Sequence, residues 1–215
     1  KLGLFMVLFR TAYTLGIEPF FFSHANNENA KETYATITKY FVIFGSLIML
    51  GVIVFVDVLK MIMIRDESYW VAMKVVPLII LANFFLGIYT NLSVWYKLID
   101  KTHIGAYISI VGAIVTLALN YLLIPLYSYY GSAIATLIAY GSMMVMSYVL
   151  GNKNYPIPYD MKKIMGYLIV SIGFSTISFY AFRENYYVGI SLLILFMYFI
   201  YHNEKPTLNR ILKRQ

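Results

Sequence analysis

The sequence predicts an all-α protein, a polytopic bundle of about seven transmembrane helices. Hydrophobic residues make up 60 % of the chain and charged residues only 13 %, and the mean hydropathy is +0.71. A soluble globular chain is roughly 45–50 % apolar and about 25 % charged. The apolar residues also gather in seven runs, each near the roughly 20 residues that the hydrocarbon core of a bilayer requires. A soluble core of this size could not bury so much apolar surface.

Turn and charge signals separate the seven runs. The expected spans lie near residues 2–22, 40–60, 70–93, 104–124, 131–150, 163–182 and 186–202, the last being at the short end. The loops between them cover residues 23–39, 61–69, 94–103, 125–130, 151–162 and 183–185, and none is long enough for a folded soluble domain. Tyrosines and tryptophans flank the runs as they do at membrane interfaces: Tyr69, Trp70, Trp95, Tyr96, Tyr129, Tyr130, Tyr186 and Tyr187.

The distribution of lysine and arginine predicts the orientation. Eleven of the 17 basic residues lie on the side that holds the first loop and the C-terminus, against five on the other side. The positive-inside rule assigns the richer side to the cytoplasm. We therefore expect a cytoplasmic C-terminus and a basic tail at the anionic lipid surface. Seven spans that begin outside suggest the C-terminal part of a larger transporter.

The first span carries two charges, Arg10 and Glu18, at the depth of the lipid. Such charges are costly and normally face a bundle interior or a watery cavity. On a helix, Arg10, Thr11, Thr14 and Glu18 share an arc of roughly 100°, which predicts one wall of a pathway for a polar solute. The two charges lie about 12 Å apart along the axis and cannot pair with each other. Two structural alternatives remain open: an ion pair with another helix, or a Glu18 that reaches the cytoplasmic surface.

The later spans carry weaker signals. The fourth and fifth have stripes of small residues that allow close helix packing. Asn83, Gly87 and Thr90 share a face of the third span and could line a path, although interhelical hydrogen bonding explains them as well. Asp57 precedes Lys60 by three residues, and we expect an interfacial pair. The stripes are Gly105, Ser109, Gly112, Thr116 and Asn120, and Gly131, Ala135, Ala139 and Ser142.

Several function classes lack their residues in this sequence. There is no GxxxxGK[ST] motif for nucleotide hydrolysis. His24, His103 and His202 have no second ligand or carboxylate at metal spacing, so we expect neither a metal or cofactor site nor an enzyme. The net charge of +7 lies in short loops, as in other membrane proteins, and does not predict a nucleic-acid partner. The absence of cysteine excludes disulfides.

Three groups of segments carry a family resemblance. Residues 9–10, 18–22 and 29–31 read Phe-Arg, Glu-Pro-Phe-Phe-Phe and Asn-Ala-Lys; residues 91–97 read Asn-Leu-Ser-Val-Trp-Tyr-Lys; residues 119–125 and 131–136 read Leu-Asn-Tyr-Leu-Leu-Ile-Pro and Gly-Ser-Ala-Ile-Ala-Thr. Together they resemble the C-terminal half of Wzx-type polysaccharide (O-antigen) flippases, within the multidrug/oligosaccharidyl-lipid/polysaccharide exporter superfamily. One departure is that Leu126 and Ser128 stand where that family often has a basic residue and glycine.

This resemblance implies a fourteen-helix exporter of two six-helix lobes and two trailing helices, in which the seven spans are helices eight to fourteen. Residues 1–150 would form part of the C-terminal lobe, 151–202 the trailing helices, and 203–215 the basic cytoplasmic tail. The implied function is the flipping of undecaprenyl-diphosphate-linked oligosaccharides across the bacterial plasma membrane by alternating access, for lipopolysaccharide or another surface polysaccharide. Membrane lipids and polysaccharide assembly proteins are the further partners it suggests.

The same resemblance aligns Arg10 with cavity arginines that are implicated in holding the diphosphate. Paired donors suit arginine to this task. Glu18 could carry a coupling proton or sodium ion, Thr11 and Thr14 could bond sugar hydroxyls, and Asn83 completes the candidate substrate-binding set. Two alternatives remain. A drug or cation antiporter of the same fold would favour acidic cavity residues, and a membrane enzyme of polysaccharide assembly would need catalytic side chains near one face.

Overall fold

The computed structural model describes residues 1–212, with side chains described as far as residue 207, and this part of the chain is helical throughout its regular elements. Within it, seven segments are long and apolar enough to cross a membrane, which confirms the predicted bundle. The elements are α1 (Leu4–Ser23), α2 (Ala30–Val54), α3 (Val56–Met63), the 3₁₀ helix η1 (Glu67–Val75), α4 (Val76–Leu92), α5 (Val94–Leu98), α6 (Thr102–Tyr127), α7 (Tyr129–Asn154), α8 (Met161–Thr176), the π-helical turn η2 (Ile177–Ala181) and α9 (Tyr186–Leu212).

Several helices extend beyond the predicted spans. Helix α2 begins at Ala30 rather than near residue 40, and its first turns are anchored because Tyr34 is buried and donates to the carbonyl of Phe21. Helix α6 continues through Pro125, and the predicted loop 125–130 reduces to a tight turn at Ser128, where φ is +51°. Helix α9 runs on through the predicted tail to residue 212, and residues 213–215 lie outside the described part. A hydropathy window finds the part of a helix that crosses lipid, not the helix ends.

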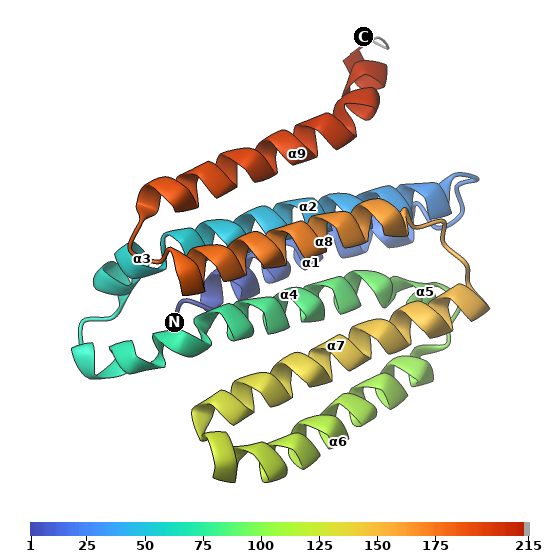
Figure 1. Cartoon of the computed structure of the whole chain (residues 1–215). Helices are drawn as coiled ribbons and strands as arrows, with labels where there is room; N and C mark the ends of the chain where they lie inside the picture. The colour runs from blue at the N-terminus through green and yellow to red at the C-terminus, as the bar shows by residue number, and fades with distance from the viewer. Residues whose placement is uncertain (213–215) are drawn as a thin grey trace.

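The helices lie side by side, with α9 at one edge and α6 at the other (Figure 1). We call one end of the bundle the basic end: it holds the connections α1–α2, α5–α6 and α7–α8 and the C-terminal end of α9. The opposite end holds α3, η1 and the turns that join α6 to α7 and α8 to α9. Each span crosses the bundle once, so successive connections alternate between the two ends.

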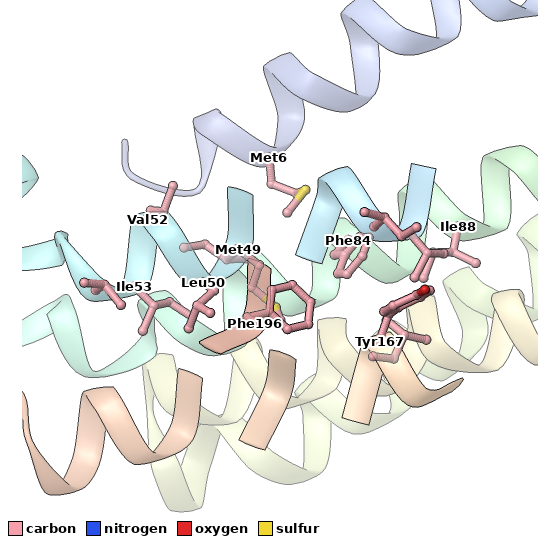
Figure 2. Packing of buried hydrophobic residues seen from close by; sticks show 14 of the residues in the cluster. Met6, Met49, Leu50, Val52, Ile53, Phe84, Ile88, Tyr167 and Phe196 are labelled. Carbon is pink, nitrogen blue, oxygen red and sulfur yellow. The ribbon is translucent and has the colours of Figure 1, made fainter. Parts of the chain in front are cut away.

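Helix α2 is the centre of the bundle. In its most apolar window 67 % of the residues are buried, against 11 % for α1, α6 and α9. Its Met49 and Leu50 belong to one buried cluster with Phe84 of α4, Tyr167 of α8 and Phe196 of α9, and Phe196 lies beside them (Figure 2). Because lipid is as apolar as these side chains, close packing rather than transfer from water holds such a core together.

Small residues make the close helix contacts that the stripes predicted. Gly105 and Gly112 are buried on α6, where an added Cβ would meet the ring of Tyr96 and the side chain of Met143. At the start of α7, a Cβ on Gly131 would collide with the backbone carbonyl of Leu123 on α6. The packing interpretation is therefore confirmed for these three glycines, whereas Ser109 of the first stripe is exposed.

A carboxylate at the opposite end joins α3 to the α8–α9 connection. Asp57, beyond the apolar span of α2, accepts two hydrogen bonds from Arg183, Nε at 2.8 Å and Nη2 at 2.7 Å, and a third from Lys60 at 3.0 Å. The guanidinium of Arg183 holds the pKa of Asp57 below its usual value, although partial burial opposes this shift. The predicted pair with Lys60 is confirmed, and Arg183 is a partner that spacing alone did not indicate.

A second shared carboxylate fastens α9 at the basic end. Glu204 is buried, and its carboxylate oxygens accept from Lys39 of α2 at 2.5 Å, from Lys163 of α8 at 3.0 Å and from the Tyr167 hydroxyl at 2.9 Å. Lys163 also donates to the carbonyl of Asn203 at 2.9 Å. Helix α9, although it lies at the edge of the bundle, is therefore tied to α2 and α8 by buried polar contacts.

Candidate functional site

The charges of the first span lie along a polar line of contact between α1 and α4. We call this line the α1–α4 seam and define it as Arg10, Tyr13, Thr14 and Glu18 of α1 with Gly87, Thr90 and Asn91 of α4 and Lys97 of α5. Gly87 lies beside Arg10, Asn91 beside Tyr13, and Lys97 beside Glu18. Contacts therefore advance along both helices in the same direction, so the first and third spans run parallel and in register.

Gly87 permits the approach of α1 at the middle of the seam. A Cβ built at this position would lie 2.6 Å from the ring of Phe41 and 3.6 Å from Cγ of Arg10. The absence of a side chain thus lets the aromatic ring of α2 and the aliphatic stem of the arginine pack against the same point of α4. A larger residue here would displace one of the two.

Arg10 itself is half-buried in the seam. In the part of the chain that the structure describes, no carboxylate lies within ion-pairing distance of its guanidinium. The ion pairs formed by those residues belong instead to Glu18, Asp57 and Glu204. The described residues therefore do not provide the structural ion pair that was one alternative for this arginine.

Hydrogen bonds close the seam one turn nearer the basic end. The Tyr13 hydroxyl donates to Oδ1 of Asn91 at 2.7 Å, and the Asn91 amide donates to the carbonyl of Gly87 at 3.1 Å. Asn91 is buried, so both functions of its amide are satisfied within the protein. Thr90 donates to the carbonyl of Leu86 in its own helix at 2.9 Å, so this bond is not the interhelical hydrogen bond that was the alternative for it.

Glu18 pairs with Lys97 at the basic end of the seam. The two side chains keep 39 % and 31 % of their surface exposed, so the pair lies at the rim and not in the core. A pocket of about 10 Å³ beside it, lined by Thr14, Thr90 and Asn91 among others, has room for about one water molecule. Glu18 therefore has an ion-pair partner on another helix, which was one of the structural alternatives.

The other two candidates lie apart from this pair. Thr11 is exposed on the outer surface of α1, away from the half-buried Arg10 and Thr14. Asn83 donates to the carbonyl of Ile79 and lines an open groove of about 930 Å³ at the opposite end. The structure thus brings Arg10, Thr14 and Glu18 onto one seam, and it separates Thr11 and Asn83 from them.

The groove at the opposite end lies between the start of α1, the end of α3, η1 and the start of α4. Its walls are mostly apolar, and its charged lining residues are Lys1, Arg65 and Asp66. Hydrogen bonds from Ser68 lower the pKa of the exposed Asp66 carboxyl. Groove and seam share α1 and α4, so the surface between these helices is wide at the opposite end and nearly closed at the basic end.

Sequence reasoning did not select Tyr13, Asn91 and Lys97 as site residues. Asn91 and Lys97 stood in the segment that resembles a helix end, but nothing in their spacing relates them to α1. The sequence offered one indication of the pair: Glu18 and Lys97 carry opposite charges and lie near the same predicted membrane face. The register that joins them arises only when two spans separated by the whole of α2 pack together.

Comparison with known proteins supplies the family. A family model described as MatE matches residues 2–122, which is more than half of the chain and covers α1 to most of α6. No curated protein and no solved structure matches the chain. The matched region contains both helices of the seam and the groove beside it. The chain therefore belongs to the MatE family, a family of multi-pass membrane exporters.

Proposed function

We propose that this exporter flips lipid-linked oligosaccharides that carry a diphosphate, of the undecaprenyl-diphosphate type, across the bacterial plasma membrane by alternating access. The observation that carries the proposal is Arg10, a cation at membrane depth without a carboxylate partner among the described residues. A charge of this kind normally faces the bundle interior or a water-filled cavity, where an anionic ligand can pair with it. Arginine suits a diphosphate because its planar fork donates two hydrogen bonds to one phosphate group.

The neighbours of Arg10 fit the other parts of such a substrate. Thr14 lies one turn away on the same half-buried face, where its hydroxyl could bond a sugar hydroxyl. The outer surface of α1 is apolar, with Leu4, Leu8 and Leu15 exposed, and could lie beside the lipid tail. Polar head and apolar tail would then be held by the two faces of one helix.

A drug or cation antiporter of the same family is the second candidate, and Glu18 is the observation that favours it. A carboxylate on the seam could bind a cation directly. In this structure, however, the charge of Glu18 is already balanced by Lys97, so the uncompensated charge of the seam is positive. That balance favours an anionic substrate.

The test is Arg10→Ala in the full-length protein, in a strain that lacks its own flippase. Loss of one charge-assisted hydrogen bond costs roughly 1.5–3 kcal/mol, or about tenfold or more in affinity. We expect surface polysaccharide to fall strongly at normal protein abundance and lipid-linked oligosaccharide to accumulate on the cytoplasmic face. Arg10→Lys should restore only part of the export, because a point charge lacks the fork.

Lys153→Ala is the matched control, since Lys153 is an exposed basic residue at the end of α7 and lines neither the seam nor the groove. It should leave export unchanged. Normal export by Arg10→Ala at matched abundance would overturn the diphosphate role. The antiporter would be supported instead if the wild type exported no polysaccharide and Glu18→Gln lost drug efflux.

A further inference from the structure

Besides Arg10, the seam contains a second cation that no sequence argument selected. Lys97 lies on α5 where the third span breaks at Ser93, and its ammonium group faces α1 at the basic end. Its partner there is Glu18. The seam therefore carries two cations and one carboxylate, and the carboxylate covers only the cation nearer the end of the bundle.

The pair of Glu18 with Lys97 is suited to exchange. About a third of each side chain is exposed, at 39 % and 31 %. Exposed ion pairs contribute only about 0–1 kcal/mol, so another anion can replace the carboxylate at small cost. A phosphate oxygen accepts the same charge-assisted hydrogen bonds from an ammonium group as a carboxylate oxygen does.

The spacing of the two cations suggests that they act in succession. Lys97 pairs with Glu18, and Glu18 lies about 12 Å from Arg10 along the axis of α1. A substrate that arrives from the basic end reaches Lys97 first and Arg10 later.

We infer that Lys97 is a second diphosphate-binding residue, masked by Glu18 when the seam is empty, and that the arriving diphosphate replaces Glu18 as its partner. This inference rests on the proposed function, because it assigns to the same seam a first contact for the same ligand. Glu18 then competes with the substrate, which is a different role from carrying a coupling ion. The geometry supports it because the partly exposed pair of Glu18 and Lys97 lies at the end of the seam that also contains Arg10.

The experiment measures binding of radiolabelled farnesyl diphosphate to the full-length protein in nanodiscs. Competition predicts effects of opposite sign. Lys97→Gln should weaken binding about tenfold, whereas Glu18→Gln should strengthen it about two- to fivefold, because the ammonium is unmasked. The double variant should bind like Lys97→Gln. Lys101→Gln is the matched control, since Lys101 is exposed in the next turn of the chain, contacts Asn154 and should leave binding unchanged.

A purely structural ion pair predicts a different pattern. Both single variants would then change binding in the same direction, or not at all, and the double variant would behave like the wild type; any of these results would overturn the inference. Melting temperatures of all variants, measured in the same nanodiscs, separate lost binding from lost folding. If Lys97→Gln lowers the melting temperature, the strengthening by Glu18→Gln remains the deciding result.

Arg10→Ala separates this inference from the proposed function. Binding that is lost in Arg10→Ala but unchanged in Lys97→Gln would leave the function standing and remove Lys97 from it. Absence of binding by the wild type would overturn both. Inorganic pyrophosphate serves as a second ligand: we expect weaker binding with the same dependence on Lys97, and equally tight binding would assign the site to a free diphosphate rather than a lipid-linked one.

Discussion

Glu204 offers the sharpest test of how the edge helix is held. Its carboxylate is 4 % exposed and is shared between Lys39, whose side chain is 11 % exposed, and Lys163, at 30 %. Glu204→Ala removes the one acceptor that these two ammonium groups share among the described residues and also leaves the Tyr167 hydroxyl without this partner. Two like charges would then face each other at the basic end, one of them nearly buried.

The expected cost follows from that burial. Removal of one partner of a buried ion pair destabilises a protein by about 3–5 kcal/mol, because the other charge remains uncompensated. Lys163 can turn toward solvent, so the lower half of that range applies. For a chain of this size, 1 kcal/mol corresponds to roughly 2–4 °C in the melting temperature. We therefore expect Glu204→Ala to melt roughly 10 °C below the wild type.

Thermal unfolding of the purified protein in one detergent, followed by near-ultraviolet circular dichroism, measures this shift. Glu184→Ala is the matched control, because Glu184 is an exposed carboxylate before the start of α9 and should change the midpoint little. Replacing Glu204, Lys39 and Lys163 together by methionine should recover most of the loss, since no charge is then left unpaired. A midpoint for Glu204→Ala within about 2 °C of the control would refute the reasoning.

Three further predictions concern the rest of the bundle. The pKa of Asp57 is lowered from its ordinary 3.8, so the ionised carboxylate stabilises the fold fully above that pH and this stabilisation is lost below it. The difference in melting temperature between the wild type and Asp57→Asn should therefore be constant from about pH 7 to 5 and should shrink below about pH 4. Gly131→Ala should destabilise by about 1–3 kcal/mol through its clash with α6, whereas Gly173→Ala, which meets no neighbour, should be neutral or stabilising in the same melting assay. Single cysteines should be shielded from an impermeant thiol reagent in intact cells at Asn27 and Asn152 and labelled at Ser128 and Asn185, and the reverse pattern would overturn the charge-based orientation.

The architecture could be predicted from the sequence because each step depends on one helix at a time. Hydropathy marks each span, charge marks the ends, and small residues mark the packed faces of α6 and α7. The helix ends could not be predicted in the same way. The segment before Tyr40 is polar, yet it is helical because Tyr34 anchors it to Phe21, a tertiary contact that no local pattern contains.

Partner choice could not be predicted for a related reason. Glu204 lies outside the apolar run, and a carboxylate at that position is expected to be a solvent-exposed residue of the tail. It is buried because α9 continues past residue 202 and carries it between α2 and α8. Likewise, Arg10 and Glu18 look equivalent on a helical projection, and only the register of α1 against α4 shows that one has a partner and the other does not among the described residues.

The unequal ends of the α1–α4 surface bear on the transport cycle that we propose. A groove of about 930 Å³ opens at the opposite end, while about 10 Å³ remains beside Glu18 and Lys97. Alternating access requires a state in which the end that receives substrate is closed, and here the closing contact is an ion pair. If a diphosphate replaces Glu18 on Lys97, then the ligand itself opens the end from which it arrives. The same exchange leaves Glu18 without its cation, so closure after release restores the pair and resets the site.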